Sequence, residues 1–277
     1  LQHSNQPRAA RKVLSGLGPG LDPGAGDASD EGWGAYPWWL AASHHMLAEY
    51  QAEIEITDRW RDSSSAGWLV TRGRALAALG REPEVLQLIQ SLGARSIDSV
   101  ATRSLAIADE LAAHGRPVAA AAVAESILVR LELGPGGGTG RARNIAWANR
   151  LLERKDQERL ALEQIARSDA DPLTVLEAQA RIAVLLADTT QAQRIDSILA
   201  EQSGRPLRGP MIRGAQIVAR AHIAAGFGRR EQAVALLQEA ITRGMLPLGS
   251  SHAYHADLLL APLRGYPPFE ALLKPDN

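Results

Sequence analysis

The residues with the clearest potential for chemistry form a glycine-rich run at positions 134–141, which could surround a phosphate group. A phosphate-binding loop needs Gly-Lys-Ser/Thr at the start of a helix that follows a buried strand. Arg141 stands where the lysine would be needed, and no serine or threonine follows it. Residues 127–133 have the pattern of a helix end. We therefore predict a flexible linker here and no nucleotide site.

Histidines near the C-terminus could present metal ligands, since His252, His255 and Asp257 are close in sequence. Zinc sites commonly use histidines four residues apart on a helix, or a distant third ligand. A spacing of three beside turn residues instead favours capping or surface histidines. His44 and His45 are adjacent, so on a helix they point about 100° apart and cannot hold one ion together. We expect one of them to pack in a helical hairpin and the other to face a groove. The sequence predicts no metal site and no cofactor.

Four of the six tryptophans lie in the first sixty residues and could stack on sugars or on a proline-rich peptide. They are Trp33, Trp38, Trp39 and Trp60. The simpler interpretation is that they form the core of a first helical hairpin. The chain has no cysteine, no nucleophile-elbow sequence and no carboxylate pair in a hydrolytic context. We predict no catalytic residues and therefore a protein that is not an enzyme.

The composition narrows the class of protein. Of the 277 residues, 30 are basic and 31 acidic, and the net charge of -1 argues against a dedicated nucleic-acid or membrane-surface binder. No run approaches the roughly 18 apolar residues of a membrane-spanning helix. The chain opens with Leu1 in what reads as the middle of a longer sequence, so we expect a fragment or a processed product. The compartment stays open, with the cytoplasm favoured.

The elements that must position any site are helices, because helical stretches alternate with short turns and strand-type alternation is almost absent. These helices fall into pairs. The turns within the pairs are expected near Ala48, Gly80, Gly115, Lys155, Ala187 and Gly228. Seven residues before each turn the side chain is small, which allows the two helices of a pair to approach closely. The small residues are Ala41, Gly73, Ala108, Ala148, Ala180 and Ala221.

The turns recur every 32 to 41 residues, around the roughly 34-residue period of tetratricopeptide repeats. Residues 221–240 resemble that family in their small residue, turn glycine and paired alanines. Residues 257–273 are similar to the ending of many bacterial multi-repeat proteins. Residues 36–47 resemble a repeat opening found behind bacterial serine/threonine kinase or transcription-regulator domains. The resemblance implies an all-α, right-handed solenoid of helix-turn-helix repeats.

This resemblance divides the chain into four parts. Residues 1–17 would be a helix left from a preceding repeat, and residues 18–34 a loop rich in Gly, Pro and Asp. Residues 35–243 would form about six helix pairs, and residues 244–277 a C-terminal capping segment.

The function implied by the resemblance is a non-catalytic scaffold, in the regulatory or sensory region of a larger bacterial signalling protein. Such an array binds a partner protein or peptide on a concave face lined by the first helices. The expected contacts are Trp38, Arg74, Asp109, Asn149, Arg181 and His222. Arg74 and Arg181 would clamp carboxylates. The alternative interpretation of these polar residues is an ordinary solvated helix face.

Two other functions fit the sequence. One is an α/α-toroid enzyme acting on carbohydrate, in which first helices converge on a centre lined by carboxylates and tryptophans. The other is a purely structural spacer that forms homo-oligomers. In none of these three functions does this segment bind nucleic acid or a membrane.

Overall fold

The computed structural model describes residues 7–9, 12, 36–59, 67–91, 96–134, 137–204, 210–243, 245 and 253–274. Of residues 36–39, 67, 204 and 210–213 it describes the backbone alone. The predicted loop at 18–34, Trp33, Trp60 and His252 lie outside the described residues, as do the side chains of Trp38 and Trp39. Within the predicted helix at 1–17, residues 7–9 and 12 are described and are helical.

The regular elements of the described residues are helices, which confirms the all-α class. They are α2 (Tyr36–Met46), α3 (Tyr50–Arg59), α4 (Gly67–Ala78), α5 (Glu82–Ser91), α6 (Ile97–Ala113), α7 (Pro117–Leu133), α8 (Thr139–Leu151), α9 (Lys155–Ala166), α10 (Pro172–Leu185), α11 (Thr189–Gly204), α12 (Pro210–Gly226), α13 (Arg230–Thr242), the 3-10 helix η2 (Ala261–Leu263) and α14 (Pro267–Leu273). None of the helices in these residues is both long and apolar enough to cross a bilayer.

The same kind of turn joins the two helices of each pair from α2–α3 to α12–α13. One residue after the first helix takes a left-handed conformation, with φ between 53° and 75°, at Ala48, Gly80, Gly115, Glu153, Ala187 and Gly228. The next N–H then bonds to the carbonyl five residues earlier, as from Arg116 to Leu111 at 2.8 Å. This bond closes the exposed end of the first helix. The turns lie where the sequence predicts them, except that the fourth is centred two residues before Lys155.

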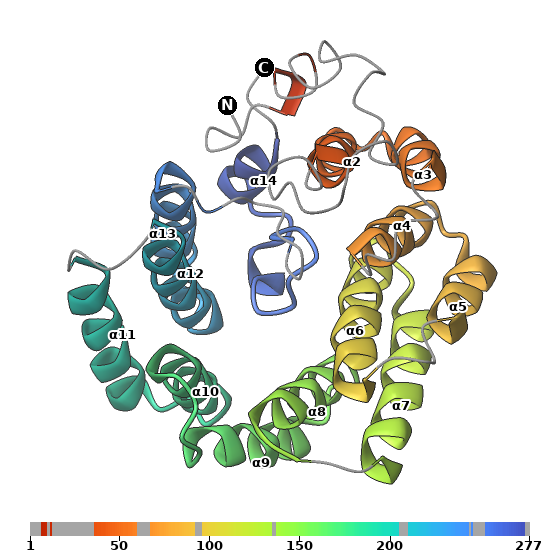
Figure 1. The fold of residues 1–277 in the computed structure, drawn as a ribbon. Coiled ribbons are helices and arrows are strands. Elements are labelled where there is room, and N and C mark those ends of the chain that lie inside the picture. The colour runs from red at the N-terminus through yellow and green to blue at the C-terminus, as the bar shows by residue number, and fades with distance from the viewer. Residues whose placement is uncertain are drawn as a thin grey trace, which may run out of the picture.

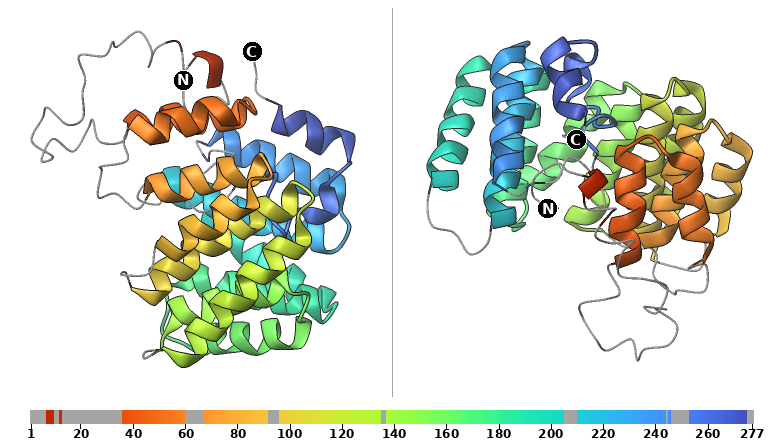
Figure 2. Two further views of the ribbon diagram at one scale, coloured as in Figure 1. Left: turned by 90° about the vertical axis from the view of Figure 1, so that its right-hand side faces the viewer. Right: turned by 90° about the horizontal axis from the view of Figure 1, so that it is seen from above.

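The helix pairs follow one another around a ring (Figure 1). Helices α4, α6, α8, α10 and α12 form its inner layer, and successive pairs lie side by side in both views of Figure 2. Residues 253–263, which we call the inner segment, lie inside this ring and end in η2. After the inner segment the chain continues into α14, which packs on α13.

The inner segment contacts both ends of the helical array. Ala253 and Ala256 pack with Ala42 of α2 in one small apolar cluster. Leu260 and Leu263 are fully buried in a second cluster, formed mainly by α12 and α13. A single stretch of chain therefore bridges helices that are about 180 residues apart in sequence.

The six small residues are all buried, as the close approach of helices requires. Gly73 shows why. An added Cβ at Gly73 would lie 3.2 Å from Leu88 of the partner helix α5 and would collide with Ile107 of the next inner helix, α6. A small residue at this position therefore serves contacts within a pair and also between neighbouring pairs.

We predict that Ala108→Leu destabilises the protein by about 1–3 kcal/mol, because Ala108 is fully buried and the extra atoms must displace packed neighbours. The matched control is Ala122→Leu on the exposed face of α7, which should change the free energy of unfolding by less than about 0.5 kcal/mol. Urea unfolding of both variants measures the difference. Equal stabilities of the two variants would contradict the role given to the small residues.

Candidate functional site

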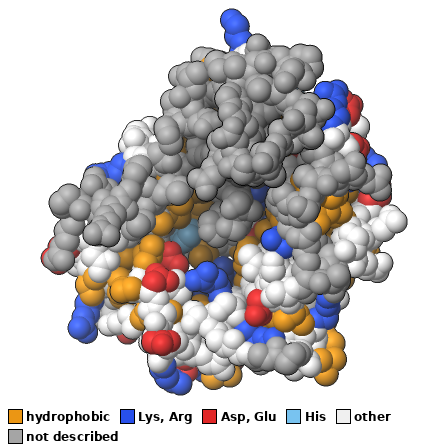
Figure 3. Space-filling view, viewed as in Figure 1, with side chains coloured by type: hydrophobic (Ala, Val, Ile, Leu, Met, Phe, Trp, Pro, Cys, Tyr) orange, Lys and Arg blue, Asp and Glu red, His pale blue; other side chains and the backbone are white. Residues whose placement is uncertain are grey.

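A pocket of about 240 Å³ lies on the inner side of the ring, between α8, α10, α12 and the inner segment. Figure 3 shows acidic, basic and histidine side chains gathered around a hollow on this face. The apolar part of the pocket lining, which we call its floor, includes Ala178, Val218, Ala219 and Ile223. Because alanines are frequent in this part of α10 and α12, the helix surfaces leave room that larger side chains would fill.

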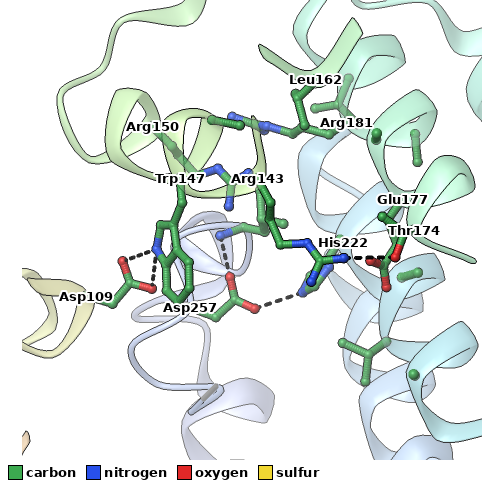
Figure 4. Close-up of a pocket in the computed structure, with 18 of the residues that line it drawn as sticks. Asp109, Arg143, Trp147, Arg150, Leu162, Thr174, Glu177, Arg181, His222 and Asp257 are labelled. Carbon is green, nitrogen blue, oxygen red and sulfur yellow. Dashed lines mark hydrogen bonds and ion pairs between the residues drawn. The ribbon is translucent and has the colours of Figure 1, made fainter. Parts of the chain in front are cut away.

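Helix α8 provides one wall through Arg143, Trp147 and Arg150, which extend in the same direction (Figure 4). Their spacing of four and three residues places them on one helix face. The indole N–H of Trp147 donates to both carboxylate oxygens of Asp109 on α6, at 3.0 Å each. Burial raises the pKa of Asp109 to about 8, although the hydrogen bond from Trp147 opposes the shift.

Behind this wall, Glu158 of α9 joins two arginines of the pocket. Its Oε1 accepts from Arg150 Nε at 2.8 Å and from Arg181 Nε at 2.9 Å, and its Oε2 accepts from Arg181 Nη2 at 3.1 Å. The Glu158 side chain is 1% exposed. Burial alone would raise the pKa of Glu158, but the hydrogen bond from Arg181 and the charge of Arg150 outweigh it, so the pKa is lowered. The three side chains thus fix α8, α9 and α10 relative to one another.

Among the four arginines that line the pocket, Arg143 is the exposed one. Its Nη2 donates to Thr174 Oγ1 at 2.9 Å, and Thr174 is in turn held by Asp171, the N-cap residue of α10. A guanidinium group has five N–H donors in a planar fork. Arg143 is therefore oriented by Thr174, and the end of its side chain lies near Thr174 and Glu177 (Figure 4).

The opposite wall joins α12 to the inner segment. His222 Nε2 lies 2.9 Å from Asp257 Oδ2, and the other oxygen of Asp257 accepts from the backbone N–H of Leu259 at 2.8 Å. Asp257 thus orients His222 toward the cavity. The wall depends on the inner segment, since Ala253, Tyr254, Ala256, Asp257 and Leu259 all line the pocket.

Four of the six predicted contact residues meet in this pocket: Arg74, Asp109, Arg181 and His222. Asn149 does not line it, because its side chain is buried and donates to Ile145 O within α8. The backbone of Trp38 lies in α2, and its side chain is outside the described part of the chain. Arg74 and Arg181, which were predicted to clamp carboxylates of a partner, lie beside carboxylates of this chain. Arg74 Nε is 3.8 Å from Glu110 Oε2, and Arg181 binds Glu158.

Sequence reasoning missed Arg143, Trp147, Arg150, Glu177 and Asp257, which also line the pocket. A signal for three of them was present, because two arginines and a tryptophan at positions i, i+4 and i+7 mark one polar face of an otherwise alanine-rich helix. Nothing in the sequence near Asp257 indicates that it meets His222.

The glycine-rich run has a structural role in the described residues. A helix, α7, precedes it, and α8 begins at Thr139. Arg141 turns back and donates to the carbonyl of Gly134 at 2.9 Å. Two histidines and one carboxylate that could hold a metal ion lie close together outside the pocket: His45, His255 and Glu110.

We predict that Glu158→Gln destabilises the protein by about 3 kcal/mol at pH 7, because two arginines lose the buried charge between them. The folded-state pKa of Glu158 lies below its ordinary value of 4.5. Its stabilising effect is therefore complete above that value and is lost as the pH falls through the lowered pKa. The difference in melting temperature between wild type and variant should shrink below pH 4.5.

The control for this experiment is Glu163→Gln on the same helix, where the pairs with Arg159 and Arg167 are more exposed. It should cost less than about 1 kcal/mol. A loss as large as that of Glu158→Gln would show that burial is not what makes the Glu158 contacts important.

Comparison of the chain with protein-family models, with curated proteins and with solved structures finds no match. The site is therefore interpreted from its own geometry.

Proposed function

We propose that this chain is a non-catalytic binding module, a right-handed solenoid of tetratricopeptide-like helix pairs whose central pocket holds an acidic group of a partner protein. The group would be the side chain of Asp or Glu, or the C-terminal carboxylate of a peptide. The resemblance of residues 36–47 and 257–273 to bacterial repeat proteins supports a place in the regulatory region of a signalling protein.

The observation that carries this proposal is Arg143. Its exposed guanidinium stands at the pocket, is oriented by Thr174, and retains donors for a further acceptor. Arginine binds carboxylates through two parallel hydrogen bonds, which makes it selective for planar acidic groups. Arg74, Arg150 and Arg181 also line the pocket, against the three carboxyl groups of Asp109, Glu177 and Asp257.

The size of the pocket sets what can enter it. A volume of about 240 Å³ accommodates one side chain or one chain terminus and is too small for a long peptide segment. The apolar floor at Ala178 and Val218 suits the aliphatic part of an acidic residue. The remainder of a peptide would then lie along the inner helices.

An enzyme acting on carbohydrate is the second candidate, because the inner helices surround one centre and three carboxyl groups line it (Figure 1). The peptide proposal is favoured by the contacts of two of those carboxyls, Asp109 and Asp257. Both oxygens of Asp109 accept from Trp147, and both oxygens of Asp257 are held by His222 and Leu259. In these contacts the two carboxyl groups hold neighbouring side chains in place, which matches a structural role.

The proposal predicts that panning a random heptapeptide phage library on the full chain enriches Asp and Glu. A synthetic peptide from the enriched set should bind Arg143→Ala at least about tenfold more weakly, since hydrogen bonds between charged groups contribute about 1.5–3 kcal/mol. Fluorescence anisotropy measures the affinity.

The control is Arg194→Ala, which removes an exposed arginine of the outer helix α11. It should leave the affinity unchanged, and replacing the acidic residue of the peptide by its amide should abolish the effect of Arg143→Ala. Enrichment without acidic preference, or equal binding by both arginine variants, would contradict the proposal. Release of dye from aryl glycosides would favour the enzyme instead.

A further inference from the structure

Away from the pocket, three histidine rings converge on one carboxylate oxygen. The Nε2 atoms of His255, His114 and His45 lie 2.7, 2.9 and 3.3 Å from Glu110 Oε1. His45 belongs to α2 and Glu110 to α6, His114 is the C-cap residue of α6, and His255 belongs to the inner segment. The side chains of Glu110 and His45 are 0% and 2% exposed, and those of His114 and His255 are 25% and 30% exposed, so the cluster extends from the interior to the surface.

Hydrogen bonds alone do not satisfy this arrangement. A carboxylate oxygen offers about two lone-pair directions, yet three ring nitrogens face Oε1 of Glu110. Its other oxygen, Oε2, is buried and accepts no hydrogen bond within the described residues, where its ion pair is with Arg74 Nε at 3.8 Å. His45 Nε2 likewise has no hydrogen-bond partner there. Buried polar atoms without such partners are uncommon and indicate an additional ligand or ion.

The second nitrogen of His45 is held as it is in many metal sites. His45 Nδ1 lies 2.8 Å from Glu53 Oε2, and the side chain of Glu53 is 1% exposed. A carboxylate on one ring nitrogen fixes the tautomer, so the other nitrogen presents its lone pair to a metal. In His45 that other nitrogen lies 3.3 Å from Glu110 Oε1, and a metal ion would take the place of the proton that otherwise joins the two atoms.

Of the three distances to Glu110 Oε1, that of His45 fits a small tetrahedral ion, whereas the 2.7 and 2.9 Å contacts of His255 and His114 would lengthen when an ion enters. Zinc binds nitrogen and oxygen ligands at about 2.0–2.2 Å, which places neighbouring ligand atoms of a tetrahedron about 3.3–3.6 Å apart. His45 Nε2 and Glu110 Oε1 are 3.3 Å apart, and the ligand atoms of His45, Glu110 and His255 all lie within 4.8 Å of one another. Tyr50 packs against the rings of His45 and His114 and covers one side of the cluster.

We propose that His45, Glu110 and His255 bind a divalent transition-metal ion, with His114 as the fourth ligand and Zn²⁺ as the metal that suits the site best. Three imidazoles and one carboxylate are ligands of intermediate softness, and four protein ligands in an interior position are typical of a structural zinc site. The expectation of no metal considered His255 together with His252 and Asp257, and the folded chain instead brings His255 to α2 and α6.

The ion would fasten the inner segment to the N-terminal part of the ring. His255 is two residues from Asp257, which forms the pocket wall with His222. Metal binding would therefore fix that wall as well as the contact of Ala253 and Ala256 with α2. This role is independent of what the pocket binds.

The test uses the full chain without a histidine tag, stripped with EDTA, desalted and titrated with ZnCl₂ or CoCl₂. We expect about one equivalent of Zn²⁺ per chain by mass spectrometry of the metal, and the intense visible bands of four-coordinate Co²⁺. His255→Ala should lower the Zn²⁺ affinity by at least about a hundredfold, since even supporting residues of metal sites contribute 10–100-fold. The His255 side chain is 30% exposed, so this variant keeps the buried part of the cluster.

Two histidine variants outside the cluster serve as matched controls. His44→Ala removes the sequence neighbour of His45; the Nδ1 atom of His44 pairs with Glu49 at 2.7 Å. His222→Ala removes the partner of Asp257. Both should bind Zn²⁺ as the wild type does, and circular dichroism should show that all variants remain helical. EDTA should lower the melting temperature of the wild type and leave that of His255→Ala unchanged.

The proposal is overturned if the stripped wild type takes up no Zn²⁺ at micromolar concentrations, or if His255→Ala binds it as tightly as the wild type does. A loss of affinity in His44→Ala equal to that in His255→Ala would also overturn it, because the ion would then bind elsewhere. Because the pocket variant Arg143→Ala leaves the cluster intact, its zinc binding should be normal whatever its peptide affinity.

Discussion

The structure depends on one long-range contact, the insertion of the inner segment between the two ends of the helical array. Without it, neighbouring helix pairs would bury each other's apolar faces, but α2 and α12 would have nothing between them. Ala253 and Ala256 meet α2, Leu260 and Leu263 meet α12 and α13, and His255 reaches Glu110 of α6. The pocket exists because this segment forms one of its walls.

The helices can surround such a small centre because their contacts are made by small side chains. Buried alanines and one glycine at equivalent positions let helices approach closely, so the apolar surface is covered without bulky residues. Small side chains also explain the pocket, because alanines on α10 and α12 leave its volume unfilled. Polar side chains that enter from α8 then need fixed positions, and Asp109, Thr174 and Glu158 provide them.

Much of the fold could be predicted from the sequence because it is local. Turn residues and small residues recur at short spacings, and the helices, the turns and the buried positions followed from them. Four of six predicted contact residues meet in one pocket because first helices present equivalent positions to the same centre. Asn149 differs, since its side-chain amide donates a hydrogen bond to the carbonyl of Ile145 in its own helix. Helical periodicity does not predict such a bond.

The cluster around Glu110 and the pair of His222 with Asp257 could not be predicted in this way. Glu110 and His255 are 145 residues apart, and no pattern near either residue indicates the other. Contacts of this kind are decided by how many helix pairs complete the ring and by where the chain then turns inward. The stripe of arginines and a tryptophan on α8 was visible in the sequence, but it lines a pocket only because the inner segment lies opposite it.

The position of the inner segment also determines the order in which the molecule can be completed during synthesis. Glu110 precedes His255 by 145 residues, so all the helix pairs from α2 to α13 are made before the inner segment that covers its charge. Until then the nascent helix pairs hold an exposed acidic group and an uncovered alanine surface on α2. Contacts with so large a sequence separation form slowly because their closure entropy is high. Docking of the inner segment, which creates the pocket, therefore follows the synthesis of all the helix pairs that it joins.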